Sequence, residues 1–175
     1  MTVLFADIVE FTKFAENVSV EVLLGVLNDI FSRFDRIADE RGLEKIKTIG
    51  DSYMVAAGLP IPVADHAIRA ANMALDMNEA MESFNQTSNY KLQVRIGIDS
   101  GAAVAGIIGK RKFLYDLWGN VVNTASRMES HGKPGAVQCT QATATLLDGS
   151  FHLVDRGDIE VDGKGAMAAF FVEAL

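Results

Sequence analysis

The sequence predicts an α+β fold in which helices pack on a mainly antiparallel β-sheet. Three observations carry this prediction: β-prone runs of alternating apolar and polar residues, two long segments with apolar side chains at helical spacing, and glycine-containing turns between short neighbouring runs. Strand, long helix, hairpin, long helix, strand pair and helix follow one another along the chain. This order favours a two-layer sandwich with its helices on one side of the sheet.

Length and composition limit the class of protein. The 175 residues, 49% hydrophobic and 22% charged, fit one globular domain with a sizeable core. The net charge of -7 disfavours a general nucleic-acid surface, which needs clustered positive charge. Cys139 is the only cysteine, so no disulfide forms within the chain. Because no apolar run is long enough to span a bilayer, we expect no membrane contact by this domain itself.

The first elements are a strand and a long helix. Thr2–Ala6 is predicted as a strand, and Asp7 after it has the spacing of a helix N-cap, with Glu10 at the third helical position. From this segment alone, a cap is favoured over a ligand role for Asp7. Apolar residues at helical spacing then predict a helix over Val20–Arg41, which Gly42 ends. Because the chain enters a strand with no leader, we expect a domain cut from a longer protein.

A hairpin follows, with Leu43–Ile49 and Ser52–Ala57 as its strands. Gly50 takes the first central position, where a type II′ turn needs a positive φ, so Asp51 is placed at the tip. Lys47 adds an ammonium group to an otherwise apolar framework. A single Gly-Asp hairpin is more often only a turn, so its functional weight depends on the rest of the chain.

The second half of the chain supplies a helix, strands and a polar loop. A helix from Asp65 through Phe84 has a broad apolar face, Tyr90–Asp99 alternates as a half-buried strand, and Ala102–Ile108 is a small-residue strand. Phe113–Gly119 is interpreted as a loop. The remaining predicted elements are a helix from Asn120, a short strand after Val137, a small helix at Ala142–Leu147 and a closing hairpin with Gly163-Lys164-Gly165 at its turn.

Asn123 and Arg127 lie four residues apart, so they project from one helix face. An amide beside a guanidinium suits phosphate and sugar oxygens. A surface pair that bonds only to Glu129 or solvent remains an open alternative for these two residues. Neither a P-loop nor a Rossmann glycine fingerprint is present, so a nucleotide must be held in another way.

Three long segments resemble the catalytic domain of class III nucleotidyl cyclases, in particular bacterial, receptor-like adenylyl cyclases of the mycobacterial kind. The segments are Phe5–Thr12, Lys45–Met54 and Tyr115–Glu129, and their order and spacing match the family over nearly the whole chain. The resemblance implies a ferredoxin-like α/β sandwich. It also implies that the domain converts ATP to 3′,5′-cyclic AMP and pyrophosphate.

The resemblance assigns a role to individual residues. Asp7 and Asp51, with the Ile8 carbonyl, are expected to hold two divalent ions, Mg²⁺ or Mn²⁺. Asn123 is expected to orient the ribose, and Arg127 to neutralise charge that develops at the α-phosphorus. Many relatives have lysine where this chain has Asp162. The residues implied in phosphate binding are Lys164, Arg111, Phe11 and Thr12.

Lys47 and Asp116 match the base-reading positions of the family. Adenine offers an acceptor at N1 and a donor at N6, so a lysine donor and a carboxylate acceptor are complementary to it. Guanine carries a donor at N1 and favours an acidic residue where Lys47 stands, so GTP leaves buried groups unpaired. We therefore expect ATP as the substrate.

Family architecture divides each site between two protomers. The metal carboxylates come from one protomer, and the lysine, aspartate, asparagine and arginine from its partner, so we expect a homodimer with two complete sites. The alternatives are a guanylyl cyclase, a silent nucleotide-sensing or dimerisation module, and a purely structural domain. The expected location is cytoplasmic, and a membrane-anchored parent protein is compatible with it.

Overall fold

The computed structural model describes residues 1–175 and contains a seven-stranded sheet in the order β2-β3-β1-β4-β7-β9-β8. All neighbouring strands are antiparallel except β4 and β7, which are parallel. The strands of this sheet are β1 (Thr2–Ile8), β2 (Glu44–Ile49), β3 (Ser52–Ala57), β4 (Val94–Ser100), β7 (Val137–Thr140), β8 (His152–Val161) and β9 (Gly165–Glu173). The mainly antiparallel α+β fold predicted from the sequence is therefore confirmed.

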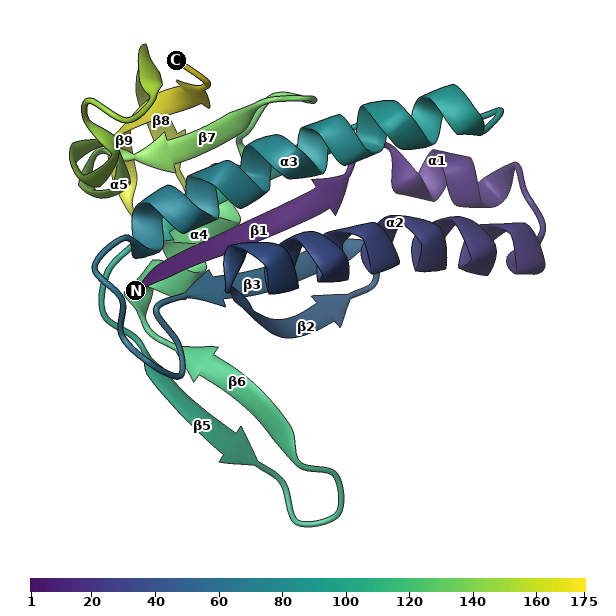
Figure 1. Cartoon of the computed structure of the whole chain (residues 1–175), viewed down its shortest axis with the longest axis horizontal. Helices are drawn as coiled ribbons and strands as arrows, with labels where there is room; N and C mark the ends of the chain where they lie inside the picture. Colours follow the sequence, from purple (N-terminus) through teal and green to yellow (C-terminus); the bar gives the residue numbers. More distant parts are fainter.

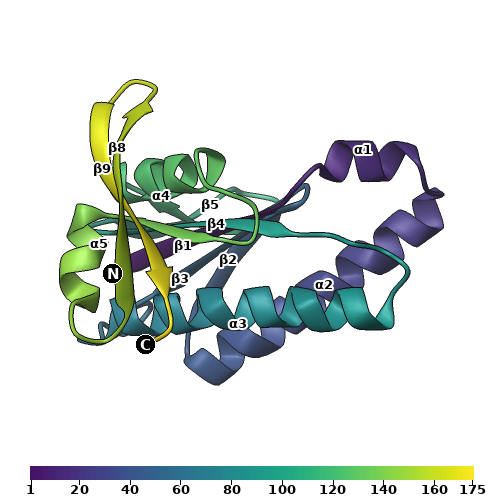
Figure 2. The same cartoon turned by 90° about the horizontal axis from the view of Figure 1, so that it is seen from above.

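Helices cover both faces of the sheet. Figure 2 shows α2 and α3 along one face and α4 on the other, so the prediction of helices on one side is wrong for α4. None of the helices combines the length and apolarity needed to cross a bilayer. The helices are α1 (Phe11–Glu16), α2 (Val20–Arg41), α3 (His66–Thr87), α4 (Asn120–Ser130) and α5 (Gln141–Leu147).

Alternation along β1 divides the core into two layers. Leu4, Ala6 and Ile8 face α2 and α3 in a cluster of 30 buried residues, whereas Val3 and Phe5 face α4. Asp7 therefore shares the α4 face of the sheet. This alternation places the predicted metal carboxylate on the same side as the predicted ribose and phosphate residues.

Gly97 lets α4 lie close against β4. A Cβ atom at this position would come within 2.0 Å of the Glu129 backbone nitrogen, so no other residue fits without displacement of the helix. The close approach brings Glu129, near the end of α4, onto β4. The small size of Gly97 thereby sets the distance between α4, with its polar face, and the sheet.

The expected N-cap role of Asp7 is wrong. Asp7 lies inside β1, in register with Ser52 of β3 on one side and Arg95 of β4 on the other. Helix α1 begins only at Phe11, after Glu10 in a left-handed conformation with φ 56°. Sheet pairing on both sides of Asp7 overrides the local cap pattern, because a strand between two partners forms ladder bonds with both.

The hairpin that carries Asp51 forms as predicted. Ile49 pairs with Ser52, which leaves Gly50 and Asp51 as a two-residue turn, and Gly50 has φ +59°. Asp51 does not have a positive φ, which is the pattern of a type II′ turn. The turn places the Asp51 carboxylate beside the end of β1.

The segment Phe113–Gly119, predicted as a loop, is mostly a strand. Strand β6 (Leu114–Trp118) pairs antiparallel with β5 (Val104–Ile108) in a separate two-stranded sheet. Figure 1 shows this hairpin projecting away from the rest of the domain.

Strand β4 also begins four residues later than the expected Tyr90. The closing hairpin of β8 and β9 forms as predicted.

Candidate active site

Two carboxylates meet where β1 ends beside the β2–β3 turn. Ser52 Oγ donates a hydrogen bond of 2.7 Å to Asp7 Oδ1, and Arg95 Nη2 donates one of 3.2 Å to Asp7 Oδ2. Burial and the nearby charge of Asp7 raise the pKa of Asp51 above its usual range, although the charge of Arg95 opposes this. The two carboxylates repel each other, so the arrangement favours a bound cation.

Arg95 also bonds to Glu129, and sequence reasoning assigned neither residue to the site. Arg95 Nε donates a hydrogen bond of 3.2 Å to Glu129 Oε1. Burial, with the charge of Asp7, raises the pKa of Glu129 to about 7, against the opposing effect of Arg95. Glu129 was considered only as a partner of Asn123 or Arg127. The strand register opposite Asp7 is the signal that points to Arg95, and the sequence alone does not fix that register.

The oxygen atoms gathered around Asp7 and Asp51 are of the kind that binds hard divalent ions. Carboxylate and carbonyl oxygens are the ligands that Mg²⁺ and Mn²⁺ prefer. Asp7 and Asp51 supply the carboxylates, and Ile8 is the last residue of β1. No group of three or more His, Cys, Asp or Glu side chains is gathered at metal-binding spacing.

A second pair joins β2 to the projecting hairpin. Lys47 Nζ donates a hydrogen bond of 2.6 Å to Asp116 Oδ2, and Asp116 Oδ1 accepts one of 2.8 Å from the Leu117 amide. Both side chains are partly exposed. The structure thus brings the two base-reading candidates together within one protomer, as a donor beside an acceptor.

A polar pocket of about 500 Å³ lies between α4 and the β8–β9 turn, and no hydrophobic residue lines it. Asn123 and Arg127 of α4 point into the same pocket as Lys164, which confirms that the two helical residues share one face. Lys164 Nζ also donates a hydrogen bond to Asn120 Oδ1 at the start of α4. The pocket offers an amide, a guanidinium and an ammonium, a combination suited to phosphate oxygens, and it also contains the carboxylate of Asp162.

The other predicted phosphate residues lie outside this pocket. Arg111 is exposed in the turn of the β5–β6 hairpin. Phe11 opens α1 and packs partly buried against the main core and Phe14, while Thr12 is exposed beside it. Within one protomer the structure therefore brings Lys164 to Asn123 and Arg127, but not Arg111, Phe11 or Thr12.

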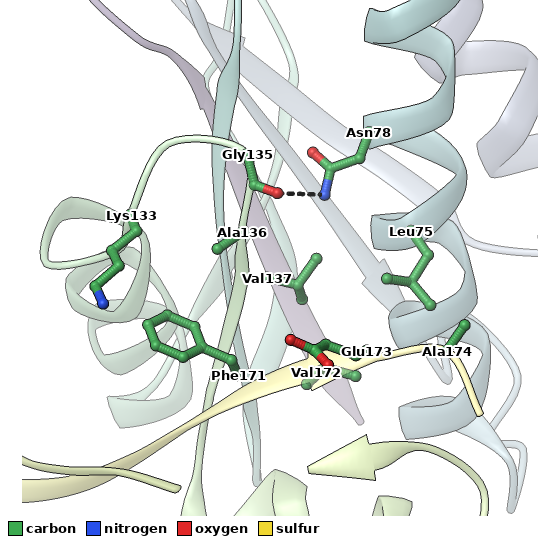
Figure 3. Close-up of a pocket in the computed structure, with 10 residues that line it drawn as sticks. All are labelled: Leu75, Asn78, Lys133, Gly135, Ala136, Val137, Phe171, Val172, Glu173 and Ala174. Atoms are coloured by element: carbon green, nitrogen blue, oxygen red, sulfur yellow. Dashed lines mark hydrogen bonds between the residues drawn. The ribbon is translucent and has the colours of Figure 1, made fainter. Parts of the chain in front are cut away.

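Another pocket, of about 460 Å³, lies between α3 and the strands β7 and β9 (Figure 3). Leu75, Val137 and Val172 give it an apolar lining, and Lys133 and Glu173 are its charged residues. None of the residues predicted from the sequence lines it. The polar pocket on α4 is therefore the better candidate for the active site.

The fold and these residue clusters identify the family. Residues 1–174 match the family model described as the adenylate and guanylate cyclase catalytic domain. The chain belongs to the class III nucleotidyl cyclases, as its three motif segments predicted.

The relatives include both kinds of cyclase. The chain is 43% identical to rat "Guanylate cyclase soluble subunit beta-2" over 98% of its own length and 25% of that protein. It is 42% identical to an "Adenylate cyclase" of Mycobacterium bovis, over 98% of the chain and 39% of the relative. The solved guanylate cyclase domain of RhGC from Catenaria anguillulae, in complex with GTP, superposes with a TM-score of 0.95 at 38% identity, covering 99% of this chain and 95% of that one.

Proposed function

We propose that this domain is an adenylyl cyclase that converts ATP to 3′,5′-cyclic AMP and pyrophosphate in cyclic nucleotide signalling. The observation that carries the proposal is the ion pair between Lys47 and Asp116. An ammonium donor beside a carboxylate acceptor complements the N1 acceptor and the N6 donor of adenine. With guanine, the Lys47 donor meets the N1 donor, and the mismatch leaves polar groups unpaired.

The remaining residues supply the chemistry around the base. Asp7 and Asp51, with the Ile8 carbonyl, hold two Mg²⁺ or Mn²⁺ ions. When bound, such ions lower the pKa of the ribose 3′-hydroxyl and neutralise the triphosphate. Asn123 donates to the ribose and fixes its orientation, and Arg127 donates to the α-phosphate, where negative charge grows as the 3′-oxygen attacks. Lys164 binds the phosphates, together with Arg111, Phe11 and Thr12.

A homodimer completes the proposed site. Exposed apolar residues gather on the β5–β6 hairpin, whose Asp116 belongs to the base-reading pair; they are Val104, Ile107, Ile108, Phe113, Leu114 and Trp118. Such a patch on a projecting arm favours a protein interface. In the proposed dimer, Asp7 and Asp51 of one protomer face Lys47, Asp116, Asn123 and Arg127 of the other, so a monomer is inactive.

The domain is proposed to work inside a longer protein. The chain spans 25% of the rat relative and 39% of the mycobacterial one. We propose that it is a cytoplasmic catalytic unit of a larger parent, an arrangement that is compatible with a membrane anchor outside this chain. Regulation would then come from segments outside this chain.

A guanylyl cyclase is the second candidate, because the chain is as similar to a guanylate cyclase subunit as to an adenylate cyclase. The test measures cyclic nucleotide formation from ATP and, separately, from GTP, with Mg²⁺ or Mn²⁺, across a range of protein concentrations. We expect cyclic AMP, with specific activity that rises with concentration. Preferred turnover of GTP would overturn the substrate, and no turnover with either nucleotide would favour a silent binding module.

A further inference from the structure

The side chain of Lys164 is held by Asn120, a residue that the proposed reaction does not use. Lys164 belongs to the β8–β9 turn, where its backbone amide donates a hydrogen bond of 2.9 Å to the Val161 carbonyl. Its side chain reaches α4, and its Nζ atom donates a hydrogen bond to Asn120 Oδ1. Figure 2 shows the tip of the β8–β9 hairpin on the same side of the sheet as α4. The bond thus links the turn to the start of the helix.

Asn120 lies on the same face of α4 as the two helical residues that line the polar pocket. Asn123 follows it by three positions and Arg127 by seven, a spacing that places all three side chains along one stripe of an α-helix. All three residues are exposed. The bond to Asn120 therefore places the Lys164 ammonium at the N-terminal end of a row that carries an amide and a guanidinium.

An ammonium group needs a specific acceptor in this position. The N-terminal end of a helix carries a partial positive charge, which disfavours a cation. No Asp or Glu side chain forms an ion pair with Lys164. Asp162 lines the same pocket, and Asp99 is near enough for the Lys164 charge to oppose the rise in its pKa that burial causes. The Asn120 oxygen is thus the contact that orients the ammonium.

The chemical type of this acceptor matters for phosphate binding. An asparagine oxygen has no net charge, so it orients Lys164 without neutralising it, whereas an aspartate in the same place would form an ion pair. An ammonium group has three N–H donors, and the bond to Asn120 uses one of them. Two donors and the full positive charge therefore remain for phosphate oxygens.

We propose that Asn120 is a positioning residue that holds the charged Lys164 side chain beside Asn123 and Arg127, so that the three groups bind a polyphosphate together. A lysine side chain loses much rotamer freedom when it is fixed. If Asn120 fixes it before the ligand arrives, less of that entropy is lost on binding. The inference rests on the proposed role of Lys164 in phosphate binding, and it is independent of the choice between adenine and guanine.

The test is isothermal titration calorimetry of the whole chain with sodium tripolyphosphate in the presence of MgCl₂. Tripolyphosphate has the phosphate chain of a nucleotide without the base or the ribose. We expect saturable binding that Lys164→Ala weakens about tenfold, because a charge-assisted contact is lost. Asn120→Ala should weaken it about 3- to 10-fold, because the lysine must then be ordered during binding. Asn28→Ala, the same change at an exposed position of α2, is the matched control and should leave the affinity unchanged.

A double-variant cycle distinguishes positioning from a general structural effect. In a chain that already carries Lys164→Ala no ammonium is left to hold, so adding Asn120→Ala should change the affinity less than about twofold. Asn120→Asp should weaken binding at least as much as Asn120→Ala, because it pairs with Lys164 and repels phosphate. Its unfolding temperature should not fall, since a carboxylate is favourable in the first turn of a helix.

Three results would overturn the inference while the role of Lys164 stands. They are undiminished binding by a folded Asn120→Ala chain, undiminished binding by Asn120→Asp, and an equal effect of Asn120→Ala with and without Lys164. A different result would also remove the proposed phosphate role of Lys164: binding by Lys164→Ala as tight as that of the unmodified chain, or no saturable binding by the unmodified chain. Failure of the inference and failure of that part of the proposed function are thus distinguishable.

Discussion

Lys47 Nζ and Asp116 Oδ2 lie 2.6 Å apart although 69 positions separate the residues in the chain. The contact joins β2 to β6, the strand that sequence reasoning interpreted as a loop. Burial alone would raise the pKa of Asp116, but hydrogen bonds from Lys47 and the Leu117 amide hold that pKa below its usual value. Asp116 therefore remains an ionised acceptor at neutral pH, beside a lysine donor.

Reversal of this donor–acceptor pair should reverse the base preference. In Lys47→Glu/Asp116→Asn, a carboxylate replaces the donor and an amide that can donate replaces the acceptor, which suits the N1 donor and the carbonyl oxygen of guanine. We expect kcat/KM for ATP to fall about 10- to 100-fold, with the ratio of GTP to ATP turnover raised, because a polar group that the bound base covers and leaves unpaired costs about 1–3 kcal/mol. Initial rates of cyclic AMP and cyclic GMP formation provide the measurement.

Lys45→Glu is the matched control for this exchange. Lys45 lies on the same strand, pairs with Asp35 and makes no contact with Asp116, so the same charge change should leave base preference unaltered. An unchanged ATP preference in the double variant would contradict the assignment of the base-reading pair.

Loss of the Asp51 charge should remove activity while it preserves the fold. Asparagine adopts turn conformations readily, so Asp51→Asn keeps the β2–β3 hairpin but deprives the proposed metal site of one of its two carboxylates. We expect turnover to fall at least about 10²-fold, because the proposed ions stabilise the charge that develops in the reaction. Cyclase assays measure the loss, and thermal unfolding verifies the fold.

Asp148→Asn, an exposed change at the end of α5, is the control and should retain full activity. Retained turnover in a folded Asp51→Asn chain, measured with either metal, would refute a ligand role for Asp51.

Sequence patterns predicted correctly the elements that depend on interactions between residues close together in the chain. Helix α2 forms over the predicted Val20–Arg41, with Gly42 in the left-handed conformation that ends it. The β2–β3 turn forms because glycine permits the positive φ of Gly50. Asp7 was misassigned because its cap spacing is a local signal, whereas its place in β1 depends on partners 45 and 88 residues away. Strand β6 was missed for the same reason, since it is defined by pairing with β5 rather than by alternation.

In the candidate site, too, the short-range relationships were predicted and the long-range ones were missed. The i, i+4 spacing of Asn123 and Arg127 placed both on one helix face, and they do line one pocket. Arg95 and Glu129 were missed because their link to Asp7 requires the β1–β4 register and the close approach of α4 at Gly97. Spacing along the chain encodes neither of these long-range relationships.

Cys139 should be unreactive in the folded domain. Its residue is fully buried, and burial with the charge of Asp99 raises the pKa of the thiol from 9.0 to about 12. Since the thiolate is the nucleophile, labelling by 5,5′-dithiobis(2-nitrobenzoate) at pH 8 should be roughly 10³-fold slower than in guanidinium chloride. Because the folded state favours the protonated thiol, this group's contribution to stability is lost as pH rises from about 9 to about 12. Labelling of the native chain at the rate of an unfolded thiol would contradict the buried placement.

Sites shared between protomers predict that two inactive variants restore activity when mixed. Asp51→Asn damages the proposed metal side, and Arg127→Ala, an exposed helix position, damages the side that neutralises the α-phosphate. In a mixed dimer one site carries both lesions and the other carries none. If subunits exchange freely, half of the dimers are mixed and half of their sites are intact, so about one quarter of the unmodified activity should return.

A mixture of Asp51→Asn with Asp7→Asn is the matched control. Both substitutions affect the metal side, so every site keeps one of them and the mixture should remain inactive. If the first mixture stays as inactive as this control under conditions of subunit exchange, each site lies within a single protomer, because no pairing of these chains then assembles an undamaged set of residues.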